Sequence, residues 1–281
     1  MKNKIALAAA AASILFTGAA SAADLAARPY TKAPPMVAPV WSWTGCYIGG
    51  TVGYDRGDVR SSSVPNAAYI AGAAGGAAEA ATQVATSPVT NHPDGVTVGG
   101  GVGCNYQTGM FVIGGEADIN YSDLRFGQIR GPFPPAPGAV PYTWEEQFRS
   151  QWFVTARARA GLVIAERNLL YVTGGAAFAE FNGIKALDFP GFVGFRYQGN
   201  FDDTRVGWVV GAGWEYAFSN NWSAKVEYLH MDFGNLSAFS QRNIAAPPAA
   251  GWTHTYNLRE DVVRVGLNYR FGGMGPVVAK Y

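Results

Sequence analysis

The chain has 281 residues, of which 48% are hydrophobic and only 15% are charged. A soluble domain carries roughly 25% charged residues, and a formal net charge of +1 argues against a surface that binds nucleic acid. The 36 glycines and the 14% aromatic residues leave few strong helix formers, which favours a fold built from strands.

The N-terminal segment has the pattern of a cleaved secretory signal peptide. Lys2 and Lys4 precede an apolar run from Ile5 to Phe16, which is too short to cross a bilayer as a helix. Ala20-Ser21-Ala22 is a small-residue cleavage site. We therefore expect residues 1–22 to be removed on export, with an uncleaved anchor helix as the alternative.

No later segment predicts a membrane-spanning helix. The nearest candidate, Ala67 to Ala81, contains Glu79 and several glycines, so it is expected to be a loop. Residues 23–42 are rich in proline and predict a flexible periplasmic leader. The exported protein is therefore expected either to be soluble in the periplasm or to enter a membrane as strands.

From Trp43 to Phe271 the sequence alternates between apolar residues and small or polar residues. This period of two is typical of strands, and each segment has about the ten residues that a tilted strand needs to cross a bilayer. The facing of the fifth segment, which is rich in Gly and Ala, stays open. The eight predicted strands are 45–54, 95–106, 110–121, 151–164, 169–181, 204–218, 222–233 and 261–271.

The connections between these segments alternate in length, which is the pattern of short periplasmic turns and long outer loops. The short ones are 107–109, 165–168 and 219–221, and the long ones are 55–94, 122–150, 182–203 and 234–260. A soluble β-sandwich would also alternate along its strands, so the connections help to separate the two classes.

The positions of the aromatic and charged residues also favour a membrane barrel. Aromatic residues gather at the strand ends on the apolar face, as two interfacial girdles would require. Charges inside strands fall on the small-residue face, since an Arg facing lipid at the bilayer midplane costs roughly 2–4 kcal/mol. The predicted fold is an eight-stranded antiparallel, up-and-down transmembrane β-barrel over residues 43–271, followed by a C-terminal tail, 272–281.

Five short motifs recur at the strand edges: WTGCYIGG (43–50), GGGVGCNYQ (99–107), YVTGG (171–175), WSAKVEYL (222–229) and VGLNYRF (265–271). With these motifs in this order, the chain resembles the small porin-like outer-membrane proteins of alphaproteobacteria, the major surface proteins of Brucella and rhizobia in the OmpA-like barrel group. The resemblance implies an abundant envelope protein of the Gram-negative outer membrane without a catalytic site. The chain departs from the family pattern in continuing past Phe271 to Tyr281, so which of the two aromatics the barrel-assembly machinery reads stays open.

Ten charged residues are expected to face the lumen. An eight-stranded barrel is just wide enough for side chains to fill it, so paired charges would plug the interior. The alternative is an ion path with a slight preference for anions, because six of these residues are basic and four are acidic. The residues are Glu116, Asp118, Arg157, Arg159, Arg205, Glu215, Lys225, Glu227, Arg264 and Arg270.

Cys46 and Cys104, the only two cysteines, are expected to form a disulfide. If Tyr54 pairs with Val96 across the first two strands, the same register places Cys46 opposite Cys104 near the periplasmic end. Opposed positions of this kind can have Cα atoms about 4.5 Å apart, within disulfide range. Two free thiols facing lipid are the alternative. Neither cysteine has the spacing of a metal site.

The leading functional hypothesis is a structural envelope barrel whose long loops contact lipopolysaccharide, other cells, phage or host factors. A small diffusion channel is the alternative. A lipid-modifying enzyme is a third hypothesis, suggested by His230 on the outward face, but Asp232 stands where a serine would be needed. We therefore expect no catalytic, cofactor or metal site, and outer-membrane lipids as partners, while the oligomeric state stays undetermined.

Overall fold

The computed structural model describes residues 41–73, 75–192, 195–242 and 250–271. The expected signal peptide, most of the leader, and the tail 272–281 lie outside the described residues. The described chain consists of nine strands and two short helices. These are β1 (Gly45–Pro65), α1 (Ala67–Gly72), α2 (Gly76–Thr86), β2 (Val89–Asn91), β3 (Asp94–Thr108), β4 (Phe111–Phe133), β5 (Tyr142–Ile164), β6 (Asn168–Asp188), β7 (Arg196–Ala217), β8 (Trp222–Arg242) and β9 (Gly251–Arg270).

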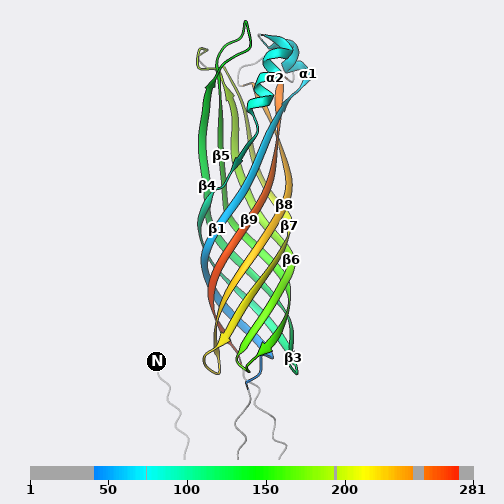
Figure 1. Cartoon of the computed structure of the whole chain (residues 1–281), viewed down its shortest axis with the longest axis vertical. Coiled ribbons are helices and arrows are strands. Elements are labelled where there is room, and N and C mark those ends of the chain that lie inside the picture. The colour runs from blue at the N-terminus through cyan, green and yellow to red at the C-terminus, as the bar shows by residue number, and fades with distance from the viewer. Residues whose placement is uncertain (1–40, 74, 193–194, 243–249, 272–281) are drawn as a thin grey trace, which may run out of the picture. The chain divides into compact units, whose positions relative to one another are not determined.

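Eight of the strands close into a ring. The antiparallel order is β1-β3-β4-β5-β6-β7-β8-β9, and β9 pairs back onto β1, while the three-residue strand β2 pairs only with β1. Closure leaves no strand edge exposed to hydrocarbon, which cannot satisfy backbone hydrogen bonds. The predicted eight-stranded up-and-down barrel is therefore confirmed (Figure 1).

The two ends of the barrel differ. At one end, the turn end, short connections join β3 to β4, β5 to β6 and β7 to β8, close to the predicted positions. The opposite end, the loop end, carries α1 and α2 between β1 and β2 (Figure 1). The expectation of a plain loop over Ala67 to Ala81 was therefore wrong, because this segment contributes to two helices. In the part of the chain that the structure describes, neither helix has the length and apolar character to cross a membrane.

All eight ring strands are longer than predicted, and all of them except β3 have 20 to 23 residues. Of the segments expected to be long loops, 122–150, 182–203 and 234–260 are largely strand, and β4 and β5 each have 23 residues. The segment 55–94 contains the end of β1, both helices and β2. About ten residues suffice to cross a bilayer with a tilted strand. The barrel wall therefore continues well past the apolar belt on the side of the loop end.

The polarity of the two barrel faces reverses between the two ends, which explains why the predicted strands are too short. In the turn-end half, apolar side chains such as Val98 and Val265 point outward and charges point inward. In the loop-end half, polar side chains such as Arg60 and Gln147 point outward. The interior there is packed with buried aromatic residues, among them Trp144, Phe148, Phe181, Trp252 and Tyr256. A prediction that requires an apolar outward face therefore ends each strand at the point where the polarity reverses.

Aromatic side chains mark the reversal on the outer face. We call this group the loop-side rim, and beyond it the outward residues are mostly charged or amide side chains. Water outside the sheet favours polar side chains there and allows an apolar core behind them. Hydrocarbon outside the turn-end half requires the opposite. The loop-side rim consists of Tyr54, Tyr121, Trp152, Trp208 and Tyr228.

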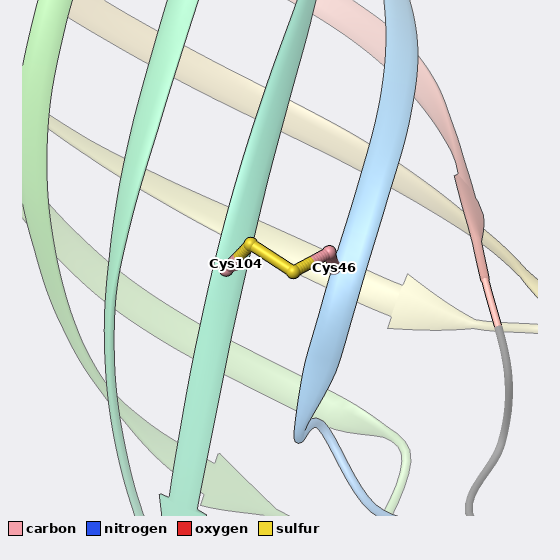
Figure 2. Close-up of a disulfide and its surroundings, with 2 residues drawn as sticks. All are labelled: Cys46 and Cys104. Carbon is pink, nitrogen blue, oxygen red and sulfur yellow. A yellow bond between two sulfur atoms is a disulfide. The ribbon is translucent and has the colours of Figure 1, made fainter.

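The predicted disulfide is present between β1 and β3 (Figure 2). Cys46 is directly opposite Cys104 in the ladder, with 4.0 Å between the Cα atoms, and Tyr54 is opposite Val96 as the predicted register requires. Both cysteines lie on the outward face near the turn end. The bond joins two neighbouring strands at the end where no turn connects them.

We expect the reversal to be visible in one strand. A spin label at Val154 of β5 should collide with oxygen dissolved in lipid, and a label at Gln147 of the same strand should collide with a water-soluble nickel complex. Both positions face outward, so they differ only in the surrounding solvent. Lipid accessibility at Gln147, or water accessibility at Val154, would contradict the division of the barrel.

Candidate functional site

The interior of the turn-end half holds a compact cluster of eight charged side chains, which we call the charge plug. They occupy inward-facing positions on the five strands β4, β5, β7, β8 and β9. The register sets three pairs of opposite charges directly across from one another: Glu116 and Arg157, Glu215 and Lys225, and Glu227 and Arg264. Cross-strand pairs of opposite charge stabilise a sheet. The charge plug consists of Glu116, Asp118, Arg157, Arg159, Glu215, Lys225, Glu227 and Arg264.

Arg157 lies at the centre of the charge plug and contacts three carboxylates. One terminal nitrogen, Nη2, lies 2.6 Å from both Glu116 Oε1 and Asp118 Oδ2. The other, Nη1, donates to Glu227 Oε1 at 2.9 Å. Because these three acids come from β4 and β8, the guanidinium group links opposite sides of the barrel interior.

Arg264 and Lys225 complete the contacts of the same acids. Arg264 Nε donates to Glu227 Oε2 at 2.8 Å, and its Nη1 donates to Asp118 Oδ1 at 3.1 Å. Lys225 Nζ donates to Glu116 Oε1 at 2.7 Å. Each carboxylate therefore has at least two basic or hydroxyl partners, as buried charges require.

Two tyrosines extend the charge plug, and the sequence analysis did not assign them. Tyr47 donates a hydrogen bond to Glu116 Oε2 at 2.6 Å, and Tyr171 donates to Glu227 Oε1 at 3.1 Å. The guanidinium of Arg159 lies 3.6 Å from the ring centroid of Tyr171 and pairs with Glu215. Tyr47 shares the alternation of Gly49 and Thr51, which could have placed it inside.

Glycines on the facing strands make room for these rings. A Cβ atom at Gly103 would lie 2.4 Å from the hydroxyl oxygen of Tyr47, and one at Gly213 would lie 2.5 Å from the ring of Tyr171. Each glycine is directly opposite the tyrosine in the ladder, so the small residues on the inward face accommodate large side chains from the neighbouring strand.

The charge plug is electrically balanced and shielded from water. It contains four basic and four acidic side chains, each exposing 4% or less of its side-chain surface in the ion pairs. Buried pairs of this kind need several hydrogen bonds to offset the loss of hydration. The charge plug itself therefore has no net formal charge.

Two of the ten residues predicted to face the lumen lie outside the charge plug. Arg205 is 31% exposed and pairs with Asp203 on its own strand, because this part of β7 lies at the level of the loop-side rim. Arg270 lies at the turn end, where its guanidinium is 3.9 Å from the ring centroid of Trp41 and its Nη2 donates to the carbonyl of Asn220. The prediction assigned both to the lumen from alternation alone.

Sequence comparisons identify the family. A profile described as "Outer membrane protein beta-barrel domain" matches residues 8–271. The chain belongs to this outer-membrane β-barrel family. It is 32% identical over 265 residues to the 31 kDa outer-membrane immunogenic protein of Brucella melitensis, covering 92% of this chain and 95% of that protein. The 25 kDa outer-membrane immunogenic protein of Brucella abortus is 26% identical over 268 residues, or 93% of this chain and 95% of that protein.

These matches confirm the family resemblance and the outer-membrane location that the motifs predict. Among solved structures, the outer membrane protein OprG of Pseudomonas aeruginosa is 11% identical, with a TM-score of 0.45 over 84% of this chain and 100% of that one. The attachment invasion locus protein Ail of Yersinia pestis is 14% identical, with a TM-score of 0.31 over 79% of this chain and 99% of that one.

The outer-membrane barrel has a second polar group inside its loop-end half. Lys185 Nζ donates to Ser61 Oγ at 2.8 Å and lies 3.4 Å from Glu146 Oε1. On the paired strands β1 and β9, Ser63 is directly opposite His254, and His254 Nδ1 lies 2.7 Å from Ser63 Oγ. His254 and Ser63 are both buried, so this serine–histidine pair is closed to substrates. Within the described ranges, no group of three or more His, Cys, Asp or Glu side chains could hold a metal ion.

We expect the charge plug to contribute strongly to the stability of the barrel. Glu116→Gln keeps the side-chain shape, but it removes the carboxylate that pairs with Lys225 and one of the three carboxylates that contact Arg157. The free energy of unfolding should therefore fall by about 3–5 kcal/mol. Urea unfolding followed by heat-modifiable gel mobility measures this loss. Arg205→Gln is the matched control, because its exposed pair should contribute about 1 kcal/mol or less. Equal stability of both variants would contradict a structural role for the charge plug.

We also expect His254 to make the barrel sensitive to acid. Burial lowers the pKa of His254 to about 3, with a contribution from the nearby charge of Lys185. The unfolded chain binds a proton near pH 6.5 and the folded chain does not, so stability falls as the pH drops below about 6.5. Between pH 6.5 and 5 the loss is about 2 kcal/mol relative to His254→Gln, in which this proton is absent. Identical pH dependence of the two proteins would exclude this contribution.

Proposed function

We propose that this outer-membrane barrel is a closed scaffold that acts through its outer surface and the loop end, and that it does not conduct solutes. In this proposal the loop end faces the outside of the cell. The observation that supports it most directly is the filled interior. The balanced charge plug occupies the turn-end half, and packed aromatic side chains occupy the loop-end half.

The loop end is built as an ordered surface, which supports a role in contact. The side-chain oxygen of Asn66 accepts a hydrogen bond from the backbone nitrogen of Tyr69 and so caps α1. The buried carboxylate of Glu79 in α2 accepts hydrogen bonds from Gln83 and from the backbone nitrogen of Ala136 in the next connection. Binding surfaces commonly consist of loops held by a rigid scaffold.

We further propose that the barrel is not a lipid hydrolase. His230 lies on the outward face, but its Nδ1 is 2.7 Å from a carboxylate oxygen of Asp261, which also accepts a hydrogen bond from Tyr228. Asp232 is engaged by Arg259 at 3.0 Å. Among the described residues, no serine or cysteine is hydrogen-bonded to His230, as nucleophilic catalysis would require.

Planar-bilayer recording tests the closed scaffold. The purified protein should give no reproducible conductance steps in bilayers where a general porin, added as a positive control, conducts. Arg264→Gln in the charge plug and Arg60→Gln on the outer face form a matched pair for identifying the path of any current. Stable steps whose ion selectivity changes with Arg264→Gln and not with Arg60→Gln would show that the lumen conducts and would overturn the proposal.

A further inference from the structure

Two arginines face each other on the outer surface of the barrel, just beyond the loop-side rim. Arg125 of β4 is directly opposite Arg149 of β5 in the ladder, and both point outward. Like charges directly opposite each other destabilise a sheet. Elsewhere on the same two strands the register pairs opposite charges, as with Glu116 and Arg157. The arginine pair is therefore an unfavourable arrangement for the barrel alone.

The surrounding carboxylates do not neutralise this pair fully. Asp123 lies 3.3 Å from Arg125 in an exposed contact, with the arginine side chain 67% exposed. Glu180 accepts hydrogen bonds from Trp152 and Asn182 instead. Arg149 has no hydrogen bond or ion pair with any residue that the structure describes. Its guanidinium donors are therefore available to a ligand.

The position of the arginine pair indicates its level relative to the membrane. Tyr121 and Trp152 of the loop-side rim are opposite each other on the same two strands, and the arginine pair follows them toward the loop end. Tyr and Trp at such a rim mark the level of the lipid headgroups. With the loop end outside the cell, Arg125 and Arg149 lie at the height of the headgroups of the outer leaflet.

A groove of about 1070 Å³ runs along the outer face of the barrel from this pair toward the loop end. Its lining combines the two arginines with amide side chains, with the aliphatic side chains of Ile129 and Ile184, and with Glu145, whose carboxylate pairs with Arg196. Outward residues of β5 follow one another along the groove at intervals of about 7 Å, so Gln147 comes next after Arg149. The outward arginine and amide side chains of the groove are Arg125, Arg149, Gln147, Asn182 and Asn200.

We propose that this groove binds the phosphorylated saccharide headgroup of the glycolipid in the outer leaflet, with a phosphate between Arg125 and Arg149. Arginine binds phosphate through two parallel charge-assisted hydrogen bonds, and the amides of the groove can bind sugar hydroxyls. A phosphate between the two guanidinium groups also relieves their repulsion. This inference rests on the proposed function, because it requires the loop end to face outward.

Equilibrium binding of bis-phosphorylated lipid A to the full-length protein in detergent micelles tests the site. Arg149→Gln should weaken binding about tenfold or more, as expected for the loss of charge-assisted hydrogen bonds. Arg259→Gln, a matched outward arginine already paired with Asp232, should change binding less than about twofold. Heat-modifiable mobility verifies that each variant is folded.

Three results would overturn the inference. Equal losses for Arg149→Gln and Arg259→Gln would mean that general surface charge attracts the lipid. Dephosphorylated lipid A binding as tightly as the bis-phosphorylated form would exclude phosphate recognition. Inorganic phosphate binding as tightly as lipid A would assign the pair to a free anion. Conductance of the unmodified protein would instead refute the closed scaffold while leaving the effect of Arg149→Gln on lipid binding measurable.

Discussion

A closed sheet in a membrane gives every strand residue one of two surroundings, the interior or the outside, and the outside changes from hydrocarbon to water along each strand. In this barrel the interior changes in the opposite direction, from charged side chains to apolar ones. Where lipid lies outside, the inward face holds the charge plug, and where water lies outside, it holds an aromatic core. The length of the strands, the rim of aromatics and the packed interior all follow from this exchange.

The membrane half of the fold could be predicted from sequence because hydrocarbon imposes a strict rule. A strand facing lipid must be apolar on one face, so alternation located all eight ring strands and the register of Cys46 against Cys104. The loop-end half follows no such rule, since water tolerates polar and scattered apolar residues alike. Segments such as 122–133 and 142–150 consequently have the composition of loops, although they continue β4 and β5.

The sequence predicts which charged residues face the interior better than it predicts how they are arranged there. Alternation placed Glu116, Arg157 and Arg264 inside, but it could not give their height in the barrel, which depends on the stagger between strands. Arg205 and Arg270 therefore appeared equivalent to the others, whereas they lie at the loop-side rim and at the turn end. Tyr171 was missed because the fifth segment is rich in small residues on both faces.

The position of the disulfide has a consequence for the integrity of the chain at the cell surface. β1 and β3 are joined by the polypeptide only through residues 66–93, at the loop end, while the Cys46–Cys104 bond joins them close to the turn end. With the loop end outside the cell, as we propose, a cut by an external protease within 66–93 leaves the N-terminal fragment covalently attached to the rest. The first strand keeps its place in the wall, and the nicked barrel separates into two pieces only when it is both denatured and reduced.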